Sequence, residues 1–179
     1  MWSRPGHLRV AGSKQVTSHG PNYSVGLYQT QYNGFPNSNV AVPSFFSTAT
    51  VVSHTTASNF DITLTSAQTS IGYQWVGYFK PNVSGNWTFT GYADDCITLW
   101  VGSNAVSNAT SATSVVNVSD TTVTSGNVSL NAGTYYPIRV QYANNQGPGS
   151  SFLHYTNGQA SNSNSWNGML FYNPVTNGF

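Results

Sequence analysis

Short runs of aromatic and β-branched residues, separated by clusters of Gly, Asn, Pro and Ser, recur along the chain and constrain its fold most strongly. No long stretch spaces its apolar residues with the period of a helix. Several runs alternate instead, so that Trp87 and Phe89 share one face of an extended segment while Thr88 and Thr90 share the other. One buried and one wetter face per strand is typical of antiparallel sheets. The sequence therefore predicts an all-β fold, an antiparallel β-sandwich of jelly-roll-like arrangement.

The strands are expected in the alternating or β-branched runs between turn clusters. They are residues 26–32, 60–64, 72–79, 86–93, 96–102, 127–130, 134–143, 151–156 and 169–172. A Ser-, Thr- and Asn-rich stretch at 107–127 is expected to be a surface excursion with short strands. Because 179 residues suffice for one domain with a real core, we predict a single sandwich domain, 26–179, preceded by a short extended arm, 1–25.

Charge is scarce in this chain. Charged residues make up 5% of it, against about 25% in ordinary soluble domains, and glutamate is absent. The net charge of +1 provides no basic field for nucleic acid. Three of the five basic residues, Arg4, Arg9 and Lys14, fall in the N-terminal arm. They indicate either an anchor that docks on another virion protein or an unstructured start of the chain.

The sequence also bears on where the protein works. No apolar segment follows Met1, so we expect no secretory signal peptide, and no apolar run is long enough to insert into a membrane. The single cysteine, Cys96, excludes an internal disulfide framework. If the sequence is complete, these features favour a protein that reaches a virion surface or the extracellular space by incorporation into a particle.

Two of the four acidic residues stand side by side. Asp94 and Asp95 are adjacent, whereas Asp61 and Asp120 are isolated. Neighbouring side chains on a regular strand point to opposite faces, so a shared target requires the backbone to leave strand geometry there. Two close carboxylates repel unless a cation lies between them. The pair therefore indicates either a site for a hard cation such as Ca²⁺ or an ordinary turn bonded to nearby main-chain N–H groups.

A loop later in the chain supplies further oxygen donors. The stretch "YANNQGPGSS", 142–151, is poor in bulky side chains and brings the amides of Asn144 and Asn145 together with several main-chain carbonyls. Ca²⁺ takes about six to eight oxygen ligands from carboxylates, amides and carbonyls. Two aspartates, an amide and loop carbonyls would form such a shell, although a stretch of this composition is also typical of a plain loop.

Three ordered motifs resemble the protective-antigen-type (PA14-like) domain found in yeast flocculins, epithelial adhesins and structural proteins of marine phages. The first is an aromatic strand, a Pro-x-x-Ser-Gly turn and an aromatic-Thr-Phe strand, within 72–89. The second is Asp-Asp before a strand that ends in Val-Gly, 94–102, and the third is "AGTYYPIRVQY", 132–142. The resemblance covers about residues 26–156 and implies the same β-sandwich fold.

The resemblance also implies a calcium site that binds sugar. By position, Asp94 and Asp95 would form a carboxylate pair joined by a cis peptide, and Asn144 would be the loop amide. The carbonyls of Gln146 and Pro148 would complete the metal ligands. The chain departs from the family pattern in two places: Cys96 stands where many members have Gly, and Pro148 stands where flocculins have a Trp that shapes sugar choice.

Sugar hydroxyls could then replace water on the ion, with Asn145 bonding further hydroxyls. An aromatic ring would stack on the C–H face of the sugar, and Tyr92, Trp100 and Trp166 are the candidates. We therefore predict a calcium-dependent, lectin-like module that binds glycans and is displayed in many copies. The alternative is a purely structural virion component, such as a capsid decoration, fibre or tail subunit, held by its arm.

Catalysis is not expected. A glycosidase needs two carboxyl groups on either side of the scissile bond, and outside the aspartate pair only two isolated aspartates remain. The Gly-x-Ser-x-Gly motif of serine hydrolases is missing. Cys96 begins an apolar strand and is expected to be an inert, buried thiol. We predict that the protein is not an enzyme.

Overall fold

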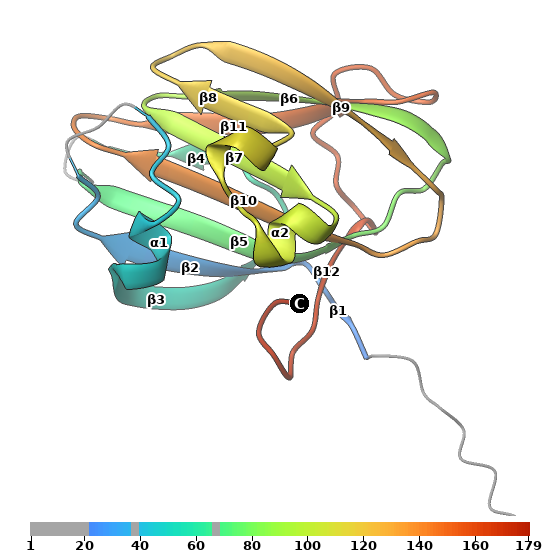
Figure 1. Cartoon of the computed structure of the whole chain (residues 1–179), viewed down its shortest axis with the longest axis horizontal. Helices are drawn as coiled ribbons and strands as arrows, with labels where there is room; N and C mark the ends of the chain where they lie inside the picture. Colours follow the sequence, from blue (N-terminus) through green and yellow to red (C-terminus); the bar gives the residue numbers. More distant parts are fainter. Residues whose placement is uncertain (1–21, 37–39, 66–68) are drawn as a thin grey trace, which may run out of the picture.

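The computed structural model describes residues 22–36, 40–65 and 69–179 (Figure 1). Two antiparallel sheets face each other, with very little helix. The predicted all-β sandwich is therefore confirmed. The proposed N-terminal arm lies almost wholly outside the described residues. The first described strand, β1 (Ser24–Val25), pairs with β12 (Leu170–Tyr172), so the sheet begins two residues before the predicted domain start.

The larger sheet has eight strands and contains the longest pairing of the fold, between β5 (Ile71–Phe79) and β10 (Tyr136–Asn144). Its main path runs β1, β12, β5, β10, β7 (Cys96–Val101) and β8 (Val116–Ser119). Two further strands extend it at β5, where β2 (Leu27–Asn33) pairs with β5 and β3 (Thr50–Ala57) pairs with β2. Strand β10 thus lies between β5 and β7 near the middle of this sheet, where its position is fixed from both sides.

The smaller sheet has four strands. Their order is β4 (Ile62–Thr63), β11 (Ser150–Thr156), β6 (Gly85–Ala93) and β9 (Val123–Leu130). Three short helical turns lie outside the sheets: α1 (Phe45–Thr48), α2 (Ser103–Ser107) and the 3₁₀ turn η1 (Ser111–Thr113). None of the helices in the described ranges has the length and apolarity needed to cross a membrane.

Aromatic side chains fill the space between the sheets. Trp87 and Phe89 from β6 are fully buried, as predicted from their alternation with threonines. The ring of Phe79 meets that of Trp87 edge to face at 5.0 Å, an arrangement that adds about 0.5–1.5 kcal/mol beyond area burial. Trp166, from the polar tail after β11, closes the core against Phe60 at 5.0 Å. This core supports the loops at both ends of the sandwich.

All nine predicted strands exist, with ends that shift by a few residues, and 107–127 forms the predicted excursion of short elements. The sequence analysis missed the strands β1 and β3 and the helical turns α1, α2 and η1. The side chains of β3 are exposed almost throughout, because it is an edge strand with no core-facing row, and so it shows no alternation. In α1, Phe45 and Phe46 are adjacent, and this pattern does not distinguish a helical turn from an extended segment.

Replacement of Leu99 by Ala tests the core. Leu99 is fully buried in β7 and lies opposite Val140 of β10. Its truncation should lower the free energy of unfolding by about 2–5 kcal/mol, because the rigid surroundings will not close the cavity. Val123→Ala, at a side chain that is 62% exposed, should change it by less than about 0.5 kcal/mol. Chemical denaturation measures both, and equal effects would contradict the assigned core.

Candidate functional site

Two connections cross between the sheets at the same end of the sandwich, the left-hand end in Figure 1. Residues 94–95 lead from β6 in the smaller sheet to β7 in the larger one, and residues 145–149 lead from β10 back to β11. The strand register holds them together, because Cys96 pairs with Ala143 and Ala93 pairs with Ser151. We call this pair of crossovers the rim. It brings the predicted aspartate pair and the predicted loop side by side.

The backbone leaves strand geometry at Asp95, as the sequence analysis required. Asp95 has a φ of 68°, in the left-handed region that Asp tolerates better than most residues. Its carbonyl accepts the main-chain N–H of Asp120 at 2.7 Å, and the N–H of Asp94 donates to the carbonyl of Ser150 at 2.8 Å. The peptide between the two aspartates is trans. The cis bond implied by the family resemblance is therefore wrong for this structure, in which the turn is made at φ of Asp95.

The Asp95 carboxylate joins the two crossovers. It is 8% exposed, and its Oδ2 accepts the main-chain N–H of Asn145. Burial raises the pKa of Asp95, the negative charge of Asp94 adds to this rise, and the main-chain N–H groups of Asn145 and Gln146 oppose it in part. The main-chain N–H groups of the loop thus stabilise the ionised carboxylate, but they do not offset the whole free-energy cost of burying its charge.

A buried hydroxyl and a buried amide lie beneath this carboxylate. Tyr142 and Asn144, both fully buried, come from the end of β10. Burial raises the pKa of Tyr142, and the charges of Asp94 and Asp95 raise it further, which places both carboxylates near this one hydroxyl. The Tyr142 hydroxyl makes no hydrogen bond with any described residue. The Asn144 amide is oriented by its Nδ2, which donates to the Gly147 carbonyl at 3.1 Å.

The carbonyls of the loop divide into two groups. Those of Asn145 and Gly149 accept N–H groups from Ser70 at 2.9 Å and Leu64 at 2.6 Å, and that of Gly147 is bonded to Asn144. The predicted ligand carbonyls are the two that lie between them in the chain. Neither Gln146 nor Pro148 has a carbonyl hydrogen bond within the described ranges, and both residues are exposed. Within the described ranges, the carbonyls of Asn145, Gly147 and Gly149 are therefore hydrogen-bonded to other protein groups, whereas those of Gln146 and Pro148 are not.

The predicted aromatic residues lie in different places. Tyr92 is half-buried on the outer face of β6, two residues before Asp94, and its ring stacks with that of Phe152 at 5.3 Å. Trp100 is fully buried at the far end of β7, with its Nε1 donating to the Thr110 carbonyl at 2.7 Å. Trp166 lies in the core. Trp100 and Trp166 present no ring to a ligand, and this corrects their assignment, whereas Phe152 was missed because its partner strand was unknown.

The donor set at the rim consists of oxygen atoms. Within the described part of the chain, no three His, Cys, Asp or Glu side chains gather as a metal site. Cys96, next to the pair, is buried, its Sγ lies 3.9 Å from the Ala143 carbonyl, and burial raises the pKa of its thiol to about 12. The predicted burial of this thiol is confirmed. Two carboxylates, an amide and carbonyls suit a hard cation. This oxygen donor set does not suit the soft metals, which prefer sulfur ligands.

Comparisons with known proteins agree with this architecture. The GLEYA domain family matches residues 71–157, which span both crossovers, whereas no curated protein matches the sequence. The Epithelial Adhesin 9 A domain from Candida glabrata, solved with Galb1-4GlcNAc, superposes with a TM-score of 0.69 at 19% identity, over 87% of this chain and 93% of that one.

Two further solved structures show the same fold. The Epithelial Adhesin 6 A domain from Candida glabrata, solved with Galb1-3GlcNAc, has a TM-score of 0.69 at 19% identity, over 87% of this chain and 89% of that one. The PA14 domain of the MpAFP antifreeze protein has a TM-score of 0.64 at 14% identity, over 89% of this chain and 96% of that one. The resemblance to PA14-like domains is thereby confirmed.

Replacement of Gly149 by Ala tests the packing at the rim. A Cβ there would lie 2.5 Å from both the Asn144 Oδ1 and the Tyr142 hydroxyl, so these side chains must move. We expect a loss of about 1–3 kcal/mol in the free energy of unfolding. Gly158→Ala is the matched control, because its Cβ would meet nothing within 4 Å. If both variants melt like the wild type in a thermal scan, the close packing at Gly149 is disproved.

Stability should depend on pH through Asp95 when divalent cations are chelated. Its folded-state pKa is raised, so the folded protein binds more protons than the unfolded chain. The free energy of unfolding should therefore rise as pH falls from 7 through the folded-state pKa toward the unfolded value of about 3.9. Asp95→Asn should flatten this profile, whereas Asp61→Asn, at an exposed site, should retain it. If the free energy of unfolding of Asp95→Asn depended on pH as that of the wild type does, the raised pKa of Asp95 would be disproved.

Proposed function

We propose that this PA14-like domain is a carbohydrate-binding module for adhesion, with a calcium-dependent saccharide site at the rim. The observation that carries the proposal is the convergence of Asp94 and Asp95 with the 145–149 loop through the hydrogen bond from the Asn145 N–H to Asp95. Support also comes from solved domains of the same fold that hold Galb1-4GlcNAc, Galb1-3GlcNAc and beta-lactose.

The residues at the rim fit Ca²⁺. A buried carboxylate next to a second one carries net negative charge, and the raised pKa of Asp95 expresses the unfavourable energy of that charge without a cation. The side chains of Asp94, Asp95 and Asn144, with the carbonyls of Gln146 and Pro148, would hold the ion. When bound, Ca²⁺ supplies open coordination positions that sugar hydroxyls can take in place of water.

The protein's own side chains would determine direction and selectivity. Asn145 follows Asn144 at the end of β10, and its amide would hydrogen-bond sugar hydroxyls beside the ion. The half-exposed pair Tyr92 and Phe152 forms an aromatic surface beside the rim on which the C–H face of a sugar would stack. Pro148 is exposed and offers little lateral contact, so we expect modest affinity from a single site.

Weak single sites suit display in many copies, because tethering raises the effective concentration of the second binding event. We accordingly propose a non-catalytic protein exposed on a virion surface or in the extracellular space, bound to glycans through several copies. The low charge of the chain and its amide- and hydroxyl-rich composition support this part of the proposal.

A thermal-shift titration tests the proposal. Ca²⁺ binds only the folded state, so at a hundredfold excess over its Kd it should raise the free energy of unfolding by about 2.7 kcal/mol relative to chelator. Asp94→Asn should abolish the shift. Its carboxylate lies at the rim, and its main-chain bond to Ser150 is retained in the variant. Asp61→Asn, which removes an equal charge away from the rim, should keep the shift.

A glycan panel that contains both Gal-GlcNAc linkages and lactose then distinguishes sugar binding from metal binding. Binding in Ca²⁺ that is lost in chelator and in Asp94→Asn supports the module. A calcium shift without any glycan bound would leave the ion a purely structural role and refute saccharide recognition. The absence of any shift would refute the metal site.

A further inference from the structure

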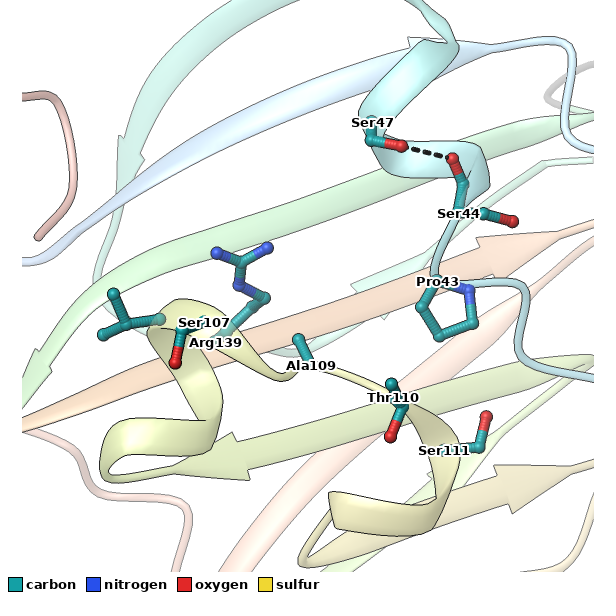
Figure 2. Close-up of a pocket in the computed structure, with 9 residues that line it drawn as sticks. Pro43, Ser44, Ser47, Ser107, Ala109, Thr110, Ser111 and Arg139 are labelled. Atoms are coloured by element: carbon teal, nitrogen blue, oxygen red, sulfur yellow. Dashed lines mark hydrogen bonds between the residues drawn. The ribbon is translucent and has the colours of Figure 1, made fainter.

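A second polar site lies on the outer face of the larger sheet, around Arg139. An open groove of about 590 Å³ runs between two walls, residues 43–47 at α1 and residues 106–111 at α2 and η1. Strand β10 forms its floor through Arg139 (Figure 2). Arg139 is five positions before Asn144 on the same strand, about 17 Å along it, whereas α1, one wall of the groove, packs against Cys96 and Ala143 near the rim.

Arg139 points into this groove because of the alternation of β10. Its neighbours Ile138 and Val140 are fully buried in the core, so the arginine side chain leaves from the opposite face. Figure 2 shows its guanidinium projecting between the two walls. The ring of Phe179 lies 5.5 Å from the guanidinium carbon.

Among the described residues, no acidic side chain pairs with this cation. Arg139 makes no hydrogen bond or ion pair with any described residue, and its Nε is fully buried without an acceptor. The aspartates lie elsewhere: three are at the rim or bonded to it, and Asp61 accepts the amide of Asn164. Burial lowers the pKa of Arg139, but a guanidinium remains charged at any physiological pH. The groove therefore carries one uncompensated positive charge.

The walls are rich in hydroxyls. Ser44, Ser47, Ser107 and Ser111 line the groove, together with small apolar surface from Val106. Hydroxyls that can both donate and accept hydrogen bonds suit the alternating hydroxyls of a sugar. A volume of about 590 Å³ lies within the range of small-ligand sites and would accept one or two sugar residues.

We propose that this groove binds a carboxylate-bearing saccharide, such as a uronic or sialic acid, with its carboxylate on Arg139. The planar guanidinium matches a carboxylate in a bidentate arrangement. A single cation with no second basic group nearby fits a monovalent carboxylate better than a doubly charged phosphate. The site is independent of Ca²⁺ and does not rest on the function proposed for the rim.

An NMR titration of the wild-type chain in chelator tests the inference. Glucuronic acid and N-acetylneuraminic acid are the probes, with glucose and acetate as neutral-sugar and bare-carboxylate controls. We expect shifts of the Arg139 Nε–H and of the amides of 106–111. At least one acidic sugar should bind about tenfold more tightly than either control, and added salt should weaken it. Equal binding of acetate would overturn the saccharide class, and no binding would overturn the site.

Variants identify the residue responsible. Arg139→Gln should weaken acidic-sugar binding about tenfold or more, as expected for the loss of a charged hydrogen-bond partner. Arg139→Lys should restore it only in part. Should Arg139→Gln fail to fold, Val106→Trp decides instead: its side chain is 49% exposed, so the indole would fill the groove and abolish binding while the core stays intact.

The two sites are separated by Asp94→Asn. In chelator this variant should bind the acidic sugar like the wild type, because the rim takes no part. Loss of binding in Asp94→Asn with retention in Arg139→Gln would place the acidic sugar at the rim and overturn the groove. Unchanged binding in both Arg139→Gln and Val106→Trp would show that Arg139 only packs over the sheet beside Phe179.

Discussion

The bond between the Asp95 carboxylate and the main-chain N–H of Asn145 is the interaction on which the rim depends. It joins two crossovers that are about 50 residues apart in the chain and that run in opposite directions between the sheets. Pairing of β10 with β7 on one side and of β11 with β6 on the other places the two crossovers next to each other. The carboxylate then fixes the loop against the turn. The carboxylate thus adds a direct bond between the turn and a loop whose Asn145 and Gly149 carbonyls also accept N–H groups from Ser70 and Leu64.

Much of this arrangement could be predicted from the sequence, because strand alternation is a local property. The alternation around Trp87 and Phe89 identified a core-facing row directly, and the adjacent aspartates indicated a break in strand geometry that the φ of Asp95 confirms. The composition of 142–151 indicated the loop that meets them, and the family resemblance pointed to the same residues. These features depend on residues close together in the chain or on their order.

Other features depend on tertiary partners that no local pattern reveals. Trp100 alternates like a surface residue of β7, yet the excursion after β7 covers it and accepts its indole N–H at Thr110. Phe152 becomes relevant only because β11 pairs with β6 and brings it against Tyr92. Arg139 is likewise an ordinary polar position of β10 in the sequence. Its groove arises from two walls that lie far from it in the chain.

Buried charges and buried polar groups without a partner occur at only a few places in the described part of the chain. The core packs its apolar rows in register and its aromatic rings edge to face, and one such group within it is the buried Nε1 of Trp166, which has no hydrogen-bond partner among the described residues. At the rim, a buried carboxylate and a neighbouring one in the turn lie near a buried hydroxyl of β10 that has no partner among the described residues. In the groove, a half-buried cation lacks an anion. Such unfavourable groups persist only where the surrounding packing holds them, and they concentrate at sites of function. In a chain with so few charges, the uncompensated ones lie at the two surfaces where we propose that ligands bind.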